Sequence, residues 1–467
     1  ENLEFWFDEK VTLNHPVELS QNTALRFVTP GNGSVEDPFL TVGEALSAAD
    51  TNTSIIRVIG NEGKELNRTP FPRNYAPDSN PYDYYLGADS QGRSHSDGSN
   101  FVVPSGVTLM VDAGATFRLE NTNLDVGSSS ELVSRSGAAV QTLGTPDSKV
   151  AFTSVFYDPA EDTSGAAPRQ NPRGGDWGGI VLRADSDWQP ASEDQLADYT
   201  LRPVLNNIAN TVISFGGGQV VVDAEPQKFS ALQIEDTRPI VAFSSITYSA
   251  DSAISATPNS FQESHGRAGP EFRGNTLLGN STNGVFLAIK TEFGAPLEKL
   301  DVSARFASTE VTYVIQESLV LAGGAGSYFM DDNGVIQARP AGRLQIDPGV
   351  VIKSKSSRIE LERGNAQLLA EGSSDRRITF TGFNDVRFGA GGEFDTNGEA
   401  EDVTAPGDWG GIFLNAGTSA SIDRAYIALG GGEVPLEGGL DDFNVIEVHQ
   451  GKLRLVNSRI ENNASGH

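Results

Sequence analysis

Short runs of apolar and β-branched residues, each bounded by Gly, Asn, Asp or Ser, recur along most of the chain, whereas helical periodicity is nearly absent. Such runs are typical of β-strands closed by tight turns. Hairpin dipeptides between neighbouring runs are rare, and the loops that separate the runs differ widely in length. A solenoid tolerates such insertions better than a sandwich does, because each coil contacts only its neighbours. The pattern therefore predicts an all-β fold, a parallel β-helix with long loop insertions.

One early segment departs from this pattern and predicts a helix. Thr41 and Glu44 have the spacing of a capping box. The apolar residues around them follow helical spacing: Phe39, Val42, Ala45, Leu46 and Ala49. We expect a short N-terminal capping helix that covers the strand edges of the first coil, because open edges promote aggregation.

The string Gly-Asp-Trp-Gly-Gly-Ile occurs twice, at 175–180 and 407–412, inside a longer matching frame. The matching flanks are 107–114 with 342–349, 149–154 with 377–382, 180–184 with 412–416, 212–218 with 426–432, and 229–234 with 443–448. The repeat motif itself comprises Asp176, Trp177, Gly178 and Gly179, and Asp408, Trp409, Gly410 and Gly411. This indicates duplication of a multi-strand unit. An exposed Trp could stack on a sugar, but the shared strand context favours a packed aromatic residue at a coil corner.

These patterns divide the chain into four segments. Residues 1–100 form an entry region with a loop rich in Pro and Tyr, 101–289 a first β-helix unit, 290–340 a connecting segment, and 341–467 a second unit. No polar terminal coil follows the last strand-like block, and uncapped solenoid ends are poorly soluble. We expect further coils or another protein chain at this end.

Composition narrows the partners. The 467 residues include 34 Lys and Arg against 62 Asp and Glu, for a net charge of −28, and no Cys. Nucleic acid and anionic membranes are therefore disfavoured as partners, whereas Ca²⁺ is compatible with the charge. The lack of Cys excludes disulfides, thiolate zinc sites and cysteine catalysis. No apolar stretch approaches the roughly 20 residues of a membrane span.

An acidic loop in the second unit is the candidate metal site. Asp395, Asn397, Glu399 and Asp402 bring oxygen side chains together around a Gly, in the manner of a calcium loop. The twelve-residue EF-hand pattern is missing, and a solvated acidic turn is the alternative. The corresponding loop of the first unit, near Asp158, lacks the Asn-Gly pair.

Candidate catalytic groups are sparse. The five His residues do not fall into a recognisable set, and His265 lies in a loop, Ser264 to Arg267, that only slightly resembles the Gly-His-Gly loop of polygalacturonases. The companion acid and Arg elements of such enzymes are missing. The sequence assigns no catalytic residue.

Two sets of residues resemble a known family. The segments 31–34 and 37–46 resemble the entry of pectate-lyase-like right-handed β-helix proteins. The segments 344–353, 378–381 and 407–412 resemble the repeat of large bacterial secreted or surface β-helix proteins. The resemblance implies a right-handed β-helix in an extracellular or cell-surface setting. Such proteins are more often adhesins, surface filaments or matrix components than enzymes.

We therefore expect a non-enzymatic surface β-helix that acts as a stalk, adhesin or filament component. The alternative is a polysaccharide-binding or polysaccharide-degrading β-helix protein, with glycans as partners. It would be favoured if Tyr82, Tyr84, Tyr85 or the two Trp side chains were exposed along one line beside acidic residues. A third hypothesis is a filament subunit that docks through its C-terminal coil.

Overall fold

The structure is a computed structural model that describes residues 39, 41–49, 55–60, 83–130, 132–157, 171–187, 206–264, 267–289, 297–324, 328–330, 336–338, 341–391, 395–397, 403–436 and 439–464. By its internal contacts the chain divides into two compact parts, residues 1–40 and residues 41–467. The elements below belong to residues 41–467.

Helix α1 (Val42–Ala48) begins where the sequence predicted it. Its capping box is formed, since the Thr41 hydroxyl accepts from the Glu44 backbone N–H and the Glu44 carboxylate accepts from the Thr41 N–H. Val42 is buried, and Ala45, Leu46 and Ala49 pack on the same core. The predicted apolar stripe therefore faces the solenoid, and α1 contacts β1, the first strand.

In the part of the chain that the structure describes, the solenoid consists of five parallel sheets, which we name sheets I to V. Sheet I contains β1 (Ile55–Val58), β4 (Thr108–Asp112), β7 (Ala139–Leu143), β10 (Asn207–Ala209), β15 (Ile240–Ala242) and β20 (Glu271–Arg273). Sheet II contains β2 (Asp83–Gly87), β5 (Thr116–Glu120), β8 (Val150–Ser154), β11 (Thr211–Ser214), β16 (Ser245–Thr247) and β21 (Thr276–Leu278). Sheet III contains β3 (Phe101–Val102), β6 (Leu124–Val126), β9 (Ile180–Leu182), β14 (Leu232–Ile234), β17 (Ser252–Ala256), β22 (Thr282–Leu287), β24 (Thr312–Ile315), β29 (Val351–Ser354), β32 (Ile378–Gly382), β35 (Ala425–Ala428) and β40 (Arg459–Glu461). Sheet IV contains β23 (Ser303–Phe306), β28 (Arg343–Ile346), β31 (Gln367–Glu371), β34 (Ser419–Asp423) and β39 (Lys452–Val456). Sheet V contains β25 (Leu319–Leu321), β30 (Arg358–Leu361), β33 (Gly411–Leu414) and β38 (Ile446–Val448).

Short antiparallel hairpins and 3-10 turns interrupt the coils. The hairpins pair β12 (Gln219–Val222) with β13 (Glu225–Lys228), β18 (Glu263–Ser264) with β19 (Arg267–Ala268), β26 (Tyr328–Met330) with β27 (Ile336–Ala338), and β36 (Glu433–Leu436) with β37 (Gly439–Asp442). The 3-10 turns are η2 (Ala184–Ser186) and η4 (Pro258–Phe261). The sequence analysis did not predict these hairpins.

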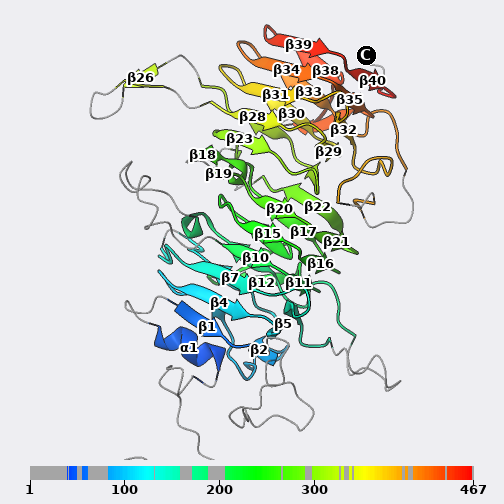
Figure 1. Ribbon diagram of the computed structural model, residues 1–467. Helices are drawn as coiled ribbons and strands as arrows, with labels where there is room; N and C mark the ends of the chain where they lie inside the picture. Colours follow the sequence, from blue (N-terminus) through cyan, green and yellow to red (C-terminus); the bar gives the residue numbers. More distant parts are fainter. Residues whose placement is uncertain are drawn as a thin grey trace, which may run out of the picture. The chain divides into compact units, whose positions relative to one another are not determined.

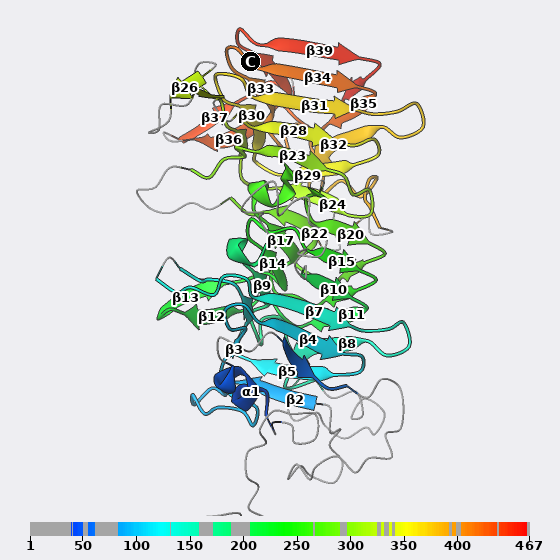
Figure 2. The same ribbon diagram turned by 60° about the vertical axis from the view of Figure 1, so that its left-hand side comes forward.

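The coils stack in chain order from α1 to β40 (Figures 1 and 2). Each coil of the first part gives one strand to sheets I, II and III in turn, as β4, β5 and β6 do. One continuous cluster of buried side chains fills the interior, from Val42 to Leu429. An all-β parallel solenoid is therefore confirmed.

The strand order shifts between the two parts of the chain. Sheet III takes the third strand of each coil up to β22, but the second strand of each coil from β24 onward, where the order is sheet IV, III, V. The segment 300–321, which the sequence analysis placed in a connecting region, contains β23, β24 and β25 and so forms a coil of its own. Sheet III alone runs through both units without a break.

Candidate functional site

The first Gly-Asp-Trp-Gly-Gly block forms a corner between β8 and β9. Trp177 is fully buried, and its indole Nε1–H donates to the Ser214 carbonyl at 2.9 Å. The Trp177 carbonyl accepts from the Gly218 N–H of the next coil. A Cβ on Gly218 would fall 2.2 Å from the Gly175 carbonyl oxygen, so only glycine fits there. The block therefore joins two coils through a side chain and a close backbone approach.

The second block repeats this geometry between β32 and β33. Trp409 is fully buried and its Nε1–H donates to the Ala428 carbonyl at 2.9 Å. The Trp409 carbonyl accepts from the Gly432 N–H. Both blocks precede the third strand of their coil, yet β9 belongs to sheet III and β33 to sheet V. The duplicated unit therefore keeps its local packing although it is shifted by one sheet.

Asp176 and Asp408 differ in their partners. Asp176 accepts from the Ser154 hydroxyl at 2.6 Å and from the Arg173 N–H. Gly382 replaces Ser154 in the second unit, and the buried Oδ2 of Asp408 has no hydrogen-bond partner among the described residues. Burial raises the pKa of Asp408, a backbone hydrogen bond from Ala405 lowers it, and the nearby Asp385 carboxylate raises it, for a net rise.

The proposed calcium loop is held by protein groups where the structure describes it. Asn283 donates its backbone N–H to the Thr396 carbonyl and its amide to the Asp395 carbonyl. Lys353 is fully buried, and its ammonium donates to the Thr396 hydroxyl at 2.7 Å. The backbone carbonyls of Asp395 and Thr396, which a calcium ion could bind, therefore already accept hydrogen bonds from protein donors. The positively charged Lys353 ammonium also lies beside the loop.

Calcium binding by the loop around Asp395 and Asn397 stays a prediction. Glu399 and Asp402 lie outside the described residues, as do Asp158, Tyr82 and His265. No group of three or more acidic or His side chains with metal-binding geometry occurs within the described ranges. Thermal melts with calcium and with chelator test the loop, because a bound ion would raise the melting temperature.

Of the tyrosines that the glycan hypothesis names, Tyr84 and Tyr85 lie within the described residues, and these two do not form an exposed line. Tyr84 is buried and its hydroxyl donates to the Ile59 carbonyl at 2.7 Å. Tyr85 is half-buried and lies 5.9 Å from the Arg118 guanidinium. Together with the buried Trp177 and Trp409, these side chains serve packing between coils.

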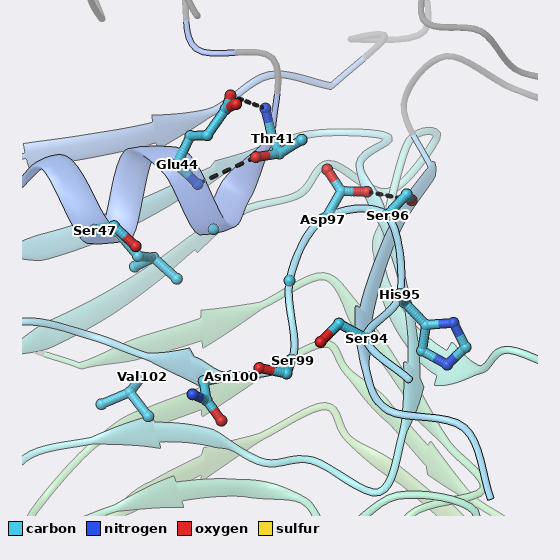
Figure 3. Close-up of a pocket in the computed structure, with 13 residues that line it drawn as sticks. Thr41, Glu44, Ser47, Ser94, His95, Ser96, Asp97, Ser99, Asn100 and Val102 are labelled. Atoms are coloured by element: carbon cyan, nitrogen blue, oxygen red, sulfur yellow. Dashed lines mark hydrogen bonds between the residues drawn. The ribbon is translucent and has the colours of Figure 1, made fainter. Parts of the chain in front are cut away.

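A polar cavity of about 590 Å³ lies between α1 and the loop 94–100 (Figure 3). Asp97 is buried there and accepts from the backbone N–H groups of Val42 and Tyr85 and from the Ser96 hydroxyl. His95 pairs with Glu120 at 2.9 Å, and its ring is turned away from the Ser94 hydroxyl. Asp97 therefore attaches α1 to the loop 94–100 and to β2, and His95 attaches the same loop to β5.

An aromatic row on the outer surface escaped the sequence analysis. Tyr157, Phe215 and Tyr248 stack on successive coils with ring centroids 5.5 and 5.4 Å apart. Tyr248 is 54% exposed, and Phe215 and Tyr248 adopt left-handed backbone conformations with φ of 61° and 57°. Leu429, at the position equivalent to Phe215 in the second unit, has the same conformation with a φ of 60°, so this conformation belongs to the coil corner. The sequence gives one sign of this row. Phe215 and Tyr248 each directly follow a strand of sheet II, so they occupy the same position in successive coils.

A second feature that the sequence did not reveal is a buried charge cluster beside the first hairpin. Arg183 donates to Asp125 at 2.8 Å and to Glu235 at 3.3 Å, and all three side chains are buried. Burial lowers the pKa of Arg183, but the hydrogen bond and charge of Asp125 and the charge of Glu235 give a net rise. The cluster links β6, β9 and β14 on the outer face of sheet III, next to a smaller cavity.

Comparison of the chain with family models, with curated proteins and with solved structures finds no match. Within the described residues, no helix is long and apolar enough to cross a membrane.

Proposed function

We propose that the chain is part of a non-enzymatic right-handed β-helix that acts as a rigid stalk or adhesive component on a bacterial surface. The observation that carries the proposal is sheet III, whose 11 strands continue through both units. A continuous hydrogen-bonded ladder gives a solenoid one rigid axis, because each coil is fixed to the next.

The repeated motif supports a mechanical role. Both Trp side chains and the glycines beside them are committed to contacts between successive coils. The net charge of −28 favours solubility and disfavours anionic partners. Contacts with other protein chains belong to this proposal.

Surface labelling of intact cells of the producing organism tests the location. Antibodies to the chain should label unpermeabilised cells or the surrounding matrix, and external protease should remove the signal. Labelling only after permeabilisation would contradict the proposal. The purified chain should also release no product from a panel of uronic-acid and neutral polysaccharides, and product release would instead favour the enzymatic alternative.

Glycan binding is the second candidate, and the aromatic row favours it. Exposed aromatic surface on a soluble protein commonly marks an interaction site. Aromatic rings offer a flat apolar face, and the Tyr hydroxyls add a hydrogen-bonding group at the ring edge. Such a surface suits ligands that have both apolar and polar faces. Glycan binding does not require that the protein degrade the polysaccharide.

A further inference from the structure

A cavity of about 210 Å³ opens on the outer face of sheet III, at the base of the hairpin β12–β13. Its floor is a row of three side chains on adjacent strands, since Gln233 is paired with Ser255 and Ser255 with Phe286. Neighbouring strands lie about 4.8 Å apart, so the row is roughly 10 Å long. This length suits a single six-membered ring with its substituents.

The lining combines hydrogen-bonding groups with one flat apolar surface. Ser255 supplies a hydroxyl, Gln233 an amide, and Glu235 a carboxylate, whereas the Thr257 hydroxyl already donates to Asp236 at 2.6 Å. Phe286, half-buried at one end of the row, supplies an aromatic ring. Such a mixture, mostly fixed in orientation by the sheet, is typical of sites for small polar ligands.

The charges of the cavity are already paired. Glu235 is bound by Arg183 and by the Gln233 amide, which donates to it at 2.6 Å. Lys228, at the base of the hairpin, forms an ion pair with Asp251 at 2.7 Å. An anionic ligand would meet two carboxylates and would have to displace Asp251 to reach Lys228. The cavity therefore favours a neutral ligand.

The second unit has different side chains at the corresponding positions. At the positions of Gln233 and Glu235 it has Glu447 and His449, and His449 stacks on Phe413 at 4.8 Å. Arg358 fills the space beneath the second hairpin, 4.2 Å from the Phe443 ring. The first hairpin covers a small apolar cluster of Val181, Val220 and Phe229, and the polar row lies beside this cluster in the lining of the cavity.

We propose that this cavity binds one neutral sugar residue of a glycan. The apolar face of the sugar packs on Phe286, and its hydroxyls exchange hydrogen bonds with Gln233, Ser255 and Glu235. The inference goes beyond the stalk function proposed above, and either proposal can fail without the other. It assigns the proposed adhesive role a ligand class, neutral sugars, and a location, the cavity at the base of the hairpin β12–β13.

Saturation-transfer NMR on the purified chain tests the proposal with glucose, galactose, mannose and N-acetylglucosamine as methyl glycosides, and with galacturonic acid as the charged comparison. We expect saturation transfer to at least one neutral sugar, and weaker transfer to galacturonic acid. Gln233→Ala should weaken binding roughly tenfold, because one hydrogen bond to the ligand is lost. Ser255→Trp should abolish binding by filling the cavity.

The matched control is Glu447→Ala, at the position equivalent to Gln233 in the second unit, which should leave binding unchanged. Circular dichroism and the melting temperature establish that each variant is folded, and Gln233→Ala carries the test if Ser255→Trp does not fold. The proposal is overturned if no neutral sugar receives saturation from the wild-type chain. It is also overturned if Gln233→Ala binds as tightly as the wild-type chain, or if galacturonic acid binds best.

Discussion

At the scale of residues, the two tryptophans show that both copies of a repeated motif serve packing between coils. Trp177 and Trp409 each donate an indole N–H to a carbonyl of the following coil, at the same distance of 2.9 Å. The sequence predicted this packed role from the shared strand context. It could not predict the one-sheet shift between the copies, because the register between coils depends on contacts distant in sequence.

The buried indole hydrogen bond should matter equally in both copies. Trp177→Phe and Trp409→Phe each leave a buried carbonyl without its donor, so we expect a loss of about 1–3 kcal/mol in the free energy of unfolding. Chemical denaturation measures it, with Tyr157→Phe on the exposed row as the control. A loss in only one of the two variants would show that the corners are not equivalent.

Asp408 provides a prediction about pH. The pKa of Asp408 is raised in the folded state, mainly by burial, so folding favours the protonated carboxyl group. As the pH rises through this raised pKa, the carboxyl group becomes charged and the fold loses stability. Asp408→Asn should therefore increase stability at neutral pH and flatten the dependence on pH in the acidic range. Melting temperatures from pH 3 to 8 measure this.

The pKa of Asp385 is shifted in the opposite direction to that of Asp408, so Asp385 serves as the comparison. Burial would raise its pKa, but hydrogen bonds from Arg387 and Thr381 hold the pKa below its usual value. Its contribution to stability is present above the unfolded pKa and is lost as pH falls through the folded one. Asp385→Asn should destabilise the chain at neutral pH, and equal effects of the two substitutions would refute the assignment.

At the scale of elements, local patterns predicted α1 and many strands, whereas the hairpins and the cavity were missed. The hairpin β12–β13 turns at Asp223 and Ala224, which both have positive φ, without the Asn-Gly signal of such turns. The cavity depends on Gln233, Ser255 and Phe286, which only the coil register brings together. Neither feature can be derived from hydrophobic alternation within one segment.

The cap of α1 gives a local prediction. Thr41→Ala removes the side-chain acceptor for the Glu44 N–H, which costs about 1 kcal/mol in a typical helix. Hydrogen exchange of residues 42–48 should accelerate, while the strands of sheet III keep their protection. Equal acceleration throughout the solenoid would mean that α1 is part of the global folding unit rather than a separable cap.

At the scale of the whole solenoid, the proposed stalk function requires that sheet III continue without a break between the units. The junction is the pairing of β22 with β24, where Val285 lies opposite Tyr313 and Phe286 opposite Val314. Stability in solenoids is approximately the sum of coil and interface terms, so a weak junction would let the two units open separately. A stalk requires that this interface be as firm as its neighbours.

Residue-resolved hydrogen exchange across the β22–β24 junction tests this most directly. We predict that the amides of these two strands exchange as slowly as those of β29 and β32 within the second unit, and that both units lose protection together as denaturant is added. Fast exchange at the junction, with the two units unfolding at different denaturant concentrations, would contradict a continuous rigid β-helix.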